Sequence, residues 1–202
     1  MSEQPIFKSI FGKDWDNLPP VMRKHYANRP YSTDVTVVEG TLDVMCRGPI
    51  KWFSWLFWLL RGIPPHNEND VLVKVNFESD ANSQSFHFNR TFHFKKRKLY
   101  SFKSRMVQIK GSEVIEIMRS RLGWKMNFVW QDGQVKLKHK GYILYFFGFF
   151  IPLPLTFLLG EGNAEETPID DDHFDMKVTI THPWWGIIYQ YRGRFKIGIA
   201  DE

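Results

Sequence analysis

A two-residue alternation of apolar and polar side chains dominates the chain beyond the proline pair at 64–65, and it restricts the fold more than any other feature. It recurs in separate short stretches, which are 71–77, 86–94, 122–130, 174–180 and 187–197. Successive side chains of a β-strand point to opposite faces, so each stretch predicts a strand with one apolar face. The dipeptide Asp132-Gly133 separates two apolar runs and predicts a tight hairpin turn.

Many short strands with turn signals between them predict an antiparallel arrangement. We therefore expect a mainly β (α+β) fold, either a strongly curved antiparallel sheet or a closed β-barrel, with one or two packed helices near the N-terminus. A length of 202 residues suits a single domain over 1–202. Its segment 1–32 is expected to be helical or irregular, and the β-rich body to span 33–198, with a bulge or turn at Gly40.

Aromatic residues make up 16% of the chain, with 18 Phe and 8 Trp, and this excess favours strands around a broad apolar interior or an interface. The net charge is +5, which suits an anionic partner or simply solubility. The single cysteine, Cys46, forms no internal disulfide, and the first residues lack a secretory signal pattern. These features predict a cytoplasmic protein, with peripheral contact to the inner membrane face as an alternative.

A tryptophan-rich helix is expected at about 49–62, framed by a proline and a glycine. At about 1.5 Å per residue it spans roughly 20 Å, which is too short for a bilayer core of about 30 Å. The stretch 145–159 is similarly hydrophobic but contains two prolines. Each stretch could plug the core, cover a cavity as a lid, or lie in a membrane interface. The candidate ligand-binding residues of the helix are Trp52, Trp55, Trp58 and Arg61.

Arg90 is the most informative single residue, because it lies on the apolar face of the 86–94 strand. A buried arginine keeps its charge and needs a partner. One interpretation is a structural ion pair with a glutamate inside the barrel, or a strand end where the side chain reaches water. The other is an anchor for an acidic head group in an apolar cavity. That second interpretation predicts a cavity of a few hundred Å³, lined by the same strand face together with Tyr189 and Tyr191.

The sequence names no catalytic residue, no metal site and no cofactor. Its histidines lack the spacing of metal ligands, and neither a nucleophile elbow nor a phosphate-binding loop is present. The acidic run 161–172 is interpreted as an exposed loop. The basic run 95–98 joins two strands as a solvated tip. Because the aromatic residues share the core parity of the strands, no nucleic-acid partner is expected.

Several motifs together resemble an uncharacterised bacterial domain-of-unknown-function family, found alone or fused behind saccharopine-dehydrogenase-like reductase domains. They are Leu18-Pro19-Pro20-Val21 with His25, the tryptophan-rich helix before 64–65, Phe88 to Phe92, the run from Pro152 to Ala164-Glu165, and Phe174 to Gly193. The resemblance spans about 18–195 and implies that Arg90 and Glu165 are partners or share a site. The chain departs from the family pattern at Gly160 to Asn163 and in its lysine-rich hairpins.

Three functional hypotheses remain open at this point. The first is a binding module for a hydrophobic or amphipathic, lipid-like ligand, with Arg90, Glu165 and Tyr191 at its polar end. The second is an interaction module that docks on a reductase partner or a membrane surface, and it requires a large exposed apolar patch. The third is a small enzyme acting on an apolar substrate, and it requires Glu165 or His139 buried beside Arg90.

Overall fold

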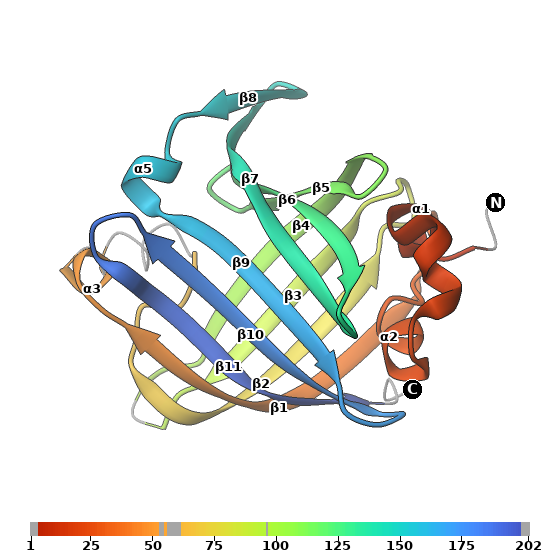
Figure 1. Ribbon diagram of the computed structural model, residues 1–202, viewed down its shortest axis with the longest axis horizontal. Coiled ribbons are helices and arrows are strands. Elements are labelled where there is room, and N and C mark those ends of the chain that lie inside the picture. The colour runs from red at the N-terminus through yellow and green to blue at the C-terminus, as the bar shows by residue number, and fades with distance from the viewer. Residues whose placement is uncertain (1–3, 53–54, 56–61, 96, 199–202) are drawn as a thin grey trace.

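The computed structural model describes residues 4–52, 55, 62–95 and 97–198. Within them, ten antiparallel strands close into a barrel (Figure 1). The barrel strands are β1 (Val35–Cys46), β2 (Glu68–Ser79), β3 (Phe86–His93), β4 (Tyr100–Lys110), β5 (Glu113–Met118), β6 (Leu122–Gln131), β7 (Gln134–Phe146), β9 (Glu161–Pro168), β10 (His173–His182) and β11 (Gly186–Gly198). Each pairs with its neighbours in sequence, and β1 pairs with β11 to close the ring. The predicted β class is confirmed, and of its two forms the barrel is present.

The alternating patterns place one face of every strand inside the barrel. On β3, Phe86, Phe88 and Phe92 are buried, and on β2 the same holds for Val71, Val73 and Val75. The turn between β6 and β7 contains Asp132 and Gly133, both with positive φ, as the hairpin prediction requires.

Short helices close one end of the barrel, which we call the capped end (Figure 1). They are α1 (Ile6–Phe11), the 3₁₀ helix η1 (Gly12–Asn17) and α2 (Pro20–His25). Pro20 occupies the first turn of α2, where its missing N–H costs no hydrogen bond. The ring of Phe7 lies 5.0 Å from that of Phe86 and 5.3 Å from that of Phe128, so α1 packs directly into the barrel core. The described chain therefore begins and ends at the capped end, because β11 also ends there (Figure 1).

Two glycines permit the close contact of β1 with β11. Gly40 was expected at a bulge or turn, but β1 continues through it and pairs it with Phe195. A Cβ atom on Gly40 would lie 2.0 Å from the carbonyl oxygen of Arg194, and one on Gly193 would lie 1.8 Å from that of Thr41. Glycine is needed at both positions because the neighbouring backbone occupies the space of a side chain.

The acidic run is not the exposed loop that its composition suggested. Residues 161–168 form β9, which pairs with β10 along its length. Inside the barrel this strand contributes Gly162, Ala164 and Glu166, while Glu165 lies on the outer face. The turn at 169–172 keeps the exposed character that was expected.

The wall is split between β7 and β9. These strands pair only from Val135 to Leu137, after which β7 turns away and pairs with β8 (Phe149–Leu153). The strand β8 and the following α5 (Thr156–Leu159) form an arm that stands off the barrel at the end opposite the helices (Figure 1). We call that end the far end; it also holds α3 (Pro49–Trp52). The hydrophobic stretch 145–159 is thus largely exposed, and its interpretation as a core plug is wrong.

Candidate functional site

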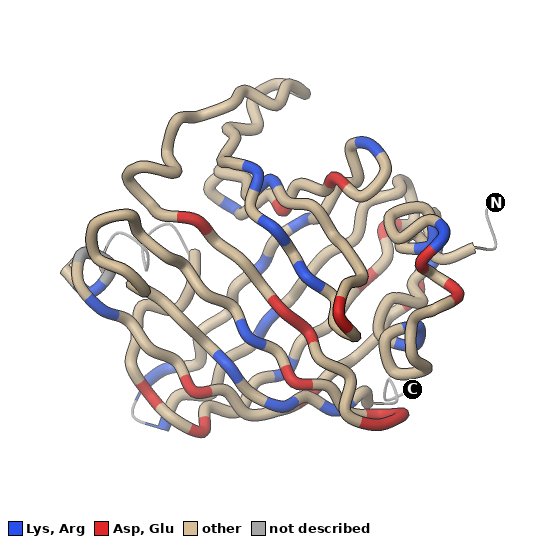
Figure 2. The backbone as a smooth tube through the Cα atoms, in the orientation of Figure 1, with Lys and Arg blue, Asp and Glu red and all other residues tan. Residues whose placement is uncertain are grey.

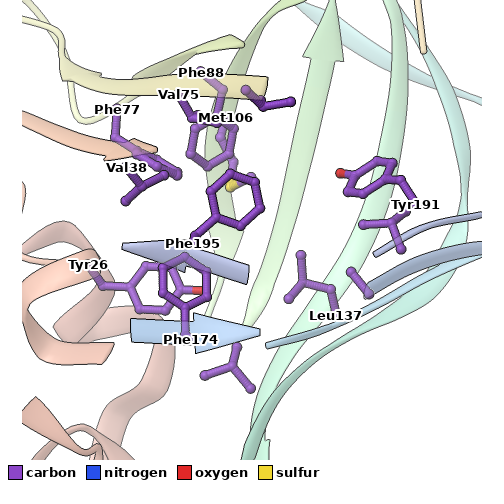
Figure 3. Close-up of a cluster of buried hydrophobic side chains, with 14 of the residues drawn as sticks. Tyr26, Val38, Val75, Phe77, Phe88, Met106, Leu137, Phe174, Tyr191 and Phe195 are labelled. Atoms are coloured by element: carbon purple, nitrogen blue, oxygen red, sulfur yellow. The ribbon is translucent and has the colours of Figure 1, made fainter. Parts of the chain in front are cut away.

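A cavity of about 50 Å³ lies inside the barrel among aromatic and aliphatic side chains. Figure 3 shows part of its wall, with Phe77, Phe88 and Phe174 on one side and Tyr191 on the other. Its acidic, arginine and histidine side chains come from four elements: Arg90 from β3, Glu116 from β5, Glu166 from β9, and the α2 residue His25. About 10–15 Å³ of such space holds one water molecule, so the cavity has room for a few waters.

Arg90 forms a structural ion pair inside the barrel. Its Nη2 lies 2.8 Å from Oε1 of Glu116, and these side chains are only 12% and 6% exposed. Arg90 Nη1 also donates a hydrogen bond of 3.0 Å to Ser104 Oγ, which in turn donates to Glu116 at 2.5 Å. The guanidinium lies 4.7 Å from the ring centre of Phe88 and 4.8 Å from that of Phe102. The ion-pair interpretation of Arg90 is therefore confirmed.

A second polar group lies where α2 meets the barrel. The hydroxyl of Tyr26 donates a hydrogen bond to Glu166, and burial together with that carboxylate raises the pKa of Tyr26 well above its usual value. His25 Nε2 lies 3.8 Å from Glu166, and its Nδ1 has no partner among the described residues. Since Glu116 already neutralises Arg90, the cavity offers no free cation from its described lining, which weighs against an acidic head group there.

Tyr191 is a predicted site residue that does reach the cavity. It projects from β11, and its hydroxyl points towards the facing aromatic cluster (Figure 3). No described residue forms a hydrogen bond with that hydroxyl, and burial raises the pKa of Tyr191 to about 12. The hydroxyl can therefore bond to a water molecule in the cavity.

The other predicted site residues lie elsewhere. Glu165 is on the outer face of β9, with its carboxylate 3.7 Å from Nζ of Lys177. The expected partnership of Arg90 with Glu165 is wrong, because the side-chain period of two turns Glu165 outward and Glu166 inward. Trp52 and Trp55 are exposed at the far end. Trp58 and Arg61 lie outside the described residues.

The cavity is much smaller than the few hundred Å³ that an interior lipid site needs. The physical reason is the filling of the barrel by large rings: Phe86, Phe92 and Phe174 are almost completely buried, and α1 adds Phe7 from the capped end. Neither Glu165 nor His139 lines the cavity beside Arg90, which is the arrangement that the enzyme hypothesis required.

Side chains rather than backbone pairs bridge the split between β7 and β9. The indole N–H of Trp124 donates to Nδ1 of His139 at 3.0 Å, and His139 Nε2 lies 3.0 Å from Oγ1 of Thr156. Because Nδ1 accepts, Nε2 carries the proton and donates to Thr156. The hydroxyl of Tyr142 donates to the carbonyl oxygen of Gly160 at 2.9 Å. Neutral His139 is thus the centre of this bridge.

Acid is expected to weaken the bridge at His139. Burial lowers the pKa of His139 below its ordinary 6.5, and the nearby charge of Glu161 opposes this shift. The unfolded chain then binds more protons than the native barrel between the lowered pKa and about 6.5, so the free energy of unfolding falls as the pH drops through this window. Urea unfolding between pH 5 and 8 should show a shallower fall for His139→Gln than for the wild type. Equal pH slopes for the two proteins would contradict this role of His139.

Exposed apolar side chains gather at the far end. Of the 18 large hydrophobic residues that are exposed among those described, 13 lie in or next to its connections. We call these 13 the apolar collar: Trp52, Trp55, Leu99, Phe146, Phe147, Phe149, Phe150, Ile151, Phe157, Leu158, Trp184, Trp185 and Ile187. The rings of Phe157 and Trp184 pack edge to face at 4.4 Å, which joins α5 to the turn between β10 and β11. An exposed apolar region of this extent is typical of a binding surface.

Sequence reasoning missed the two buried acids and part of the collar. Glu116 has the parity of a core position within the run 114–117, a signal that could have marked it as the partner of Arg90. Glu166 was hidden because its strand looked like an acidic loop. Trp184 and Trp185 form the tip of the hairpin between β10 and β11 and are exposed. Two tryptophans at a hairpin tip cannot pack into the core, a signal that could have marked them as surface residues.

A family model described as "Domain of unknown function (DUF4166)" matches residues 18–195. No curated protein and no solved structure shows significant similarity to the chain. Among the helices of the described segments, none is long and apolar enough to cross a membrane.

Proposed function

Because the chain belongs to this family, whose domain has no assigned function, we propose from geometry alone that it is a binding module for a lipid-like partner, which it holds on the apolar collar. The observation that carries this proposal is the concentration of 13 exposed large hydrophobic residues at one end of the barrel. Water-exposed aromatic rings lower the free energy of the complex when an apolar partner covers them. The proposed ligand class is the one expected from the sequence, but the proposed binding site is the apolar collar and not the barrel interior.

The small volume of the interior cavity supports this choice. A cavity of about 50 Å³ cannot hold an acyl chain, and the charge of Arg90 is already used by Glu116. The collar, by contrast, offers rings at more than half of their full exposure, including Trp184 at 63% and Phe157 at 61%. Half-burying one such ring contributes on the order of 2 kcal/mol.

A reductase partner, the alternative expected from the sequence resemblance, is the other candidate occupant of the apolar collar. The aromatic residues of the collar also suit a protein interface, where Trp and Tyr are enriched. This alternative requires a partner surface with matching apolar area, whereas the lipid proposal requires only a micelle or a bilayer.

Replacing two collar residues should separate binding from folding. We expect Trp184→Ser/Trp185→Ser to weaken binding to neutral dodecyl maltoside micelles at least about tenfold, because two exposed rings no longer enter the micelle. Isothermal titration calorimetry measures the affinity, and an unchanged urea midpoint confirms that the barrel is intact. The matched control is Ile109→Ser/Ile169→Ser, which removes two exposed hydrophobic residues near the capped end. Micelle binding that is absent in the wild type, or equal in both variants, would contradict the proposal.

A further inference from the structure

The two ends of the barrel differ sharply in charge. Five connections form the far end, over 47–67, 94–99, 119–121, 147–160 and 183–185. Their described residues include seven Lys and Arg but no Asp or Glu: Arg47, Lys51, Lys95, Arg97, Lys98, Arg119 and Arg121. In Figure 2 the arm that carries β8 and the turn between β10 and β11 show no charged residue at all. Basic side chains thus accompany the apolar collar without acidic neighbours in the same described connections.

The capped end has the opposite balance. Its described segments, 4–34, 80–85, 111–112, 132–133 and 169–172, contain eight Asp and only five Lys and Arg. Three of the acids are consecutive at 170–172, and the red turn near the C-terminal end of the chain in Figure 2 marks them. Two of the five basic residues are already paired, Lys24 with Asp172 and Arg29 with Asp34. An anionic surface therefore attracts the far end and repels the capped end.

We propose that the partner of the apolar collar is an anionic lipid bilayer, on which the barrel stands with its far end down. This inference rests on the proposed function and names the partner. Exposed tryptophans favour the interface between head groups and acyl chains, and basic side chains beside them bind anionic head groups. The β8 arm presents phenylalanines and Ile151 and contains no charged residue. No charge therefore opposes its entry into the apolar layer of the bilayer.

The geometry of the collar suits insertion at shallow depth. Its residues belong to loop tips, a hairpin arm and one-turn helices, so single rings can enter the interface while the barrel wall stays in water. Three acidic residues near these connections lie at strand ends, and Asp43 of β1 is a fourth, with its carboxylate 3.2 Å from the backbone N of Asp70 and 3.9 Å from Nε of Arg192. Asp70 is 3.9 Å from Lys95 Nζ, Glu68 accepts a hydrogen bond of 2.6 Å from the Lys95 backbone N–H, and Glu161 is exposed at the start of β9. The local basic excess is thus only partly offset.

The test is co-sedimentation of the whole protein with vesicles. Wild-type protein should bind vesicles of 30% phosphatidylglycerol in phosphatidylcholine at least about tenfold more tightly than pure phosphatidylcholine vesicles, and this preference should shrink with added salt. The variant Lys51→Glu/Lys98→Glu should lose at least about tenfold in affinity for the anionic vesicles, because two basic residues that attract anionic head groups are replaced by acids that repel them. Lys13→Glu/Arg23→Glu changes the net charge equally at the capped end and should bind as the wild type does.

The outcomes distinguish this inference from the proposal beneath it. Equal binding to both kinds of vesicle, or equal loss in the two charge variants, overturns the anionic bilayer while micelle binding keeps the lipid-like partner. Absence of binding to vesicles and micelles alike overturns both. Binding of anionic vesicles that Trp184→Ser/Trp185→Ser leaves unchanged also overturns the inference, because the collar would then not be the docking surface.

Discussion

Replacement of Glu116 by alanine is expected to lower the free energy of unfolding by about 3–5 kcal/mol, because it leaves Arg90 charged and unpaired inside the barrel. The loss extends beyond the ion pair itself. Ser104 Oγ donates to the same carboxylate oxygen and accepts from Arg90, so the substitution breaks a connected group of three side chains. Urea unfolding at neutral pH measures the change.

A matched substitution on the same strand tests this explanation. Glu113 pairs with Lys125 at the same N–O distance, 2.8 Å, but these side chains are 29% and 33% exposed. Water already solvates them in part, so Glu113→Ala should cost about 1 kcal/mol or less. The double variant Arg90→Met/Glu116→Leu should recover most of the loss, because it removes both buried charges. Similar losses for Glu116→Ala and Glu113→Ala would show that burial of the pair is not the cause.

The largest backbone effect is expected at Gly193. In Gly193→Ala the new Cβ atom would lie 1.8 Å from the carbonyl oxygen of Thr41, so β1 and β11 must separate. This seam joins the first and last strands and closes the barrel. We expect a loss of about 3 kcal/mol or more, at the upper end of the cost of overpacking.

Gly198 provides the control for this substitution. It belongs to the same strand, but a Cβ atom there would meet the Val37 carbonyl oxygen at 3.5 Å, an ordinary contact. Gly198→Ala should therefore change the free energy of unfolding by no more than about 0.5 kcal/mol. If both alanine variants unfold at the same urea concentration, the close approach at Gly193 is not what holds the seam.

Much of the fold follows from the sequence because a side-chain period of two is a local property. It placed Phe86, Phe88 and Phe92 inside the barrel and located the hairpin at 132–133. The prediction from periodicity was wrong where the acidic composition of a segment was given more weight than its alternating pattern. The acids of β9 gave the strand the appearance of a loop, although Ala164 and Glu166 keep the inward parity.

The candidate site was harder to predict because it depends on contacts distant in the sequence. Arg90 meets Glu116 across two strand pairings, and the resemblance to relatives had suggested Glu165 instead. The collar assembles from connections that share no motif. From sequence alone, the hydrophobic stretch 145–159 is equally compatible with a buried and an exposed position. Its exposure follows only from the filling of the barrel interior by other side chains, including Phe7, which α1 inserts from the capped end.

Both described chain ends leave the barrel on the side of α1 and α2, away from the collar (Figure 1). Any polypeptide joined at Gln4 or beyond Gly198 would consequently extend from the acidic capped end and leave the apolar collar uncovered. On the proposed bilayer, the barrel would therefore hold both described chain ends away from the membrane surface, at a distance set by the length of its strands.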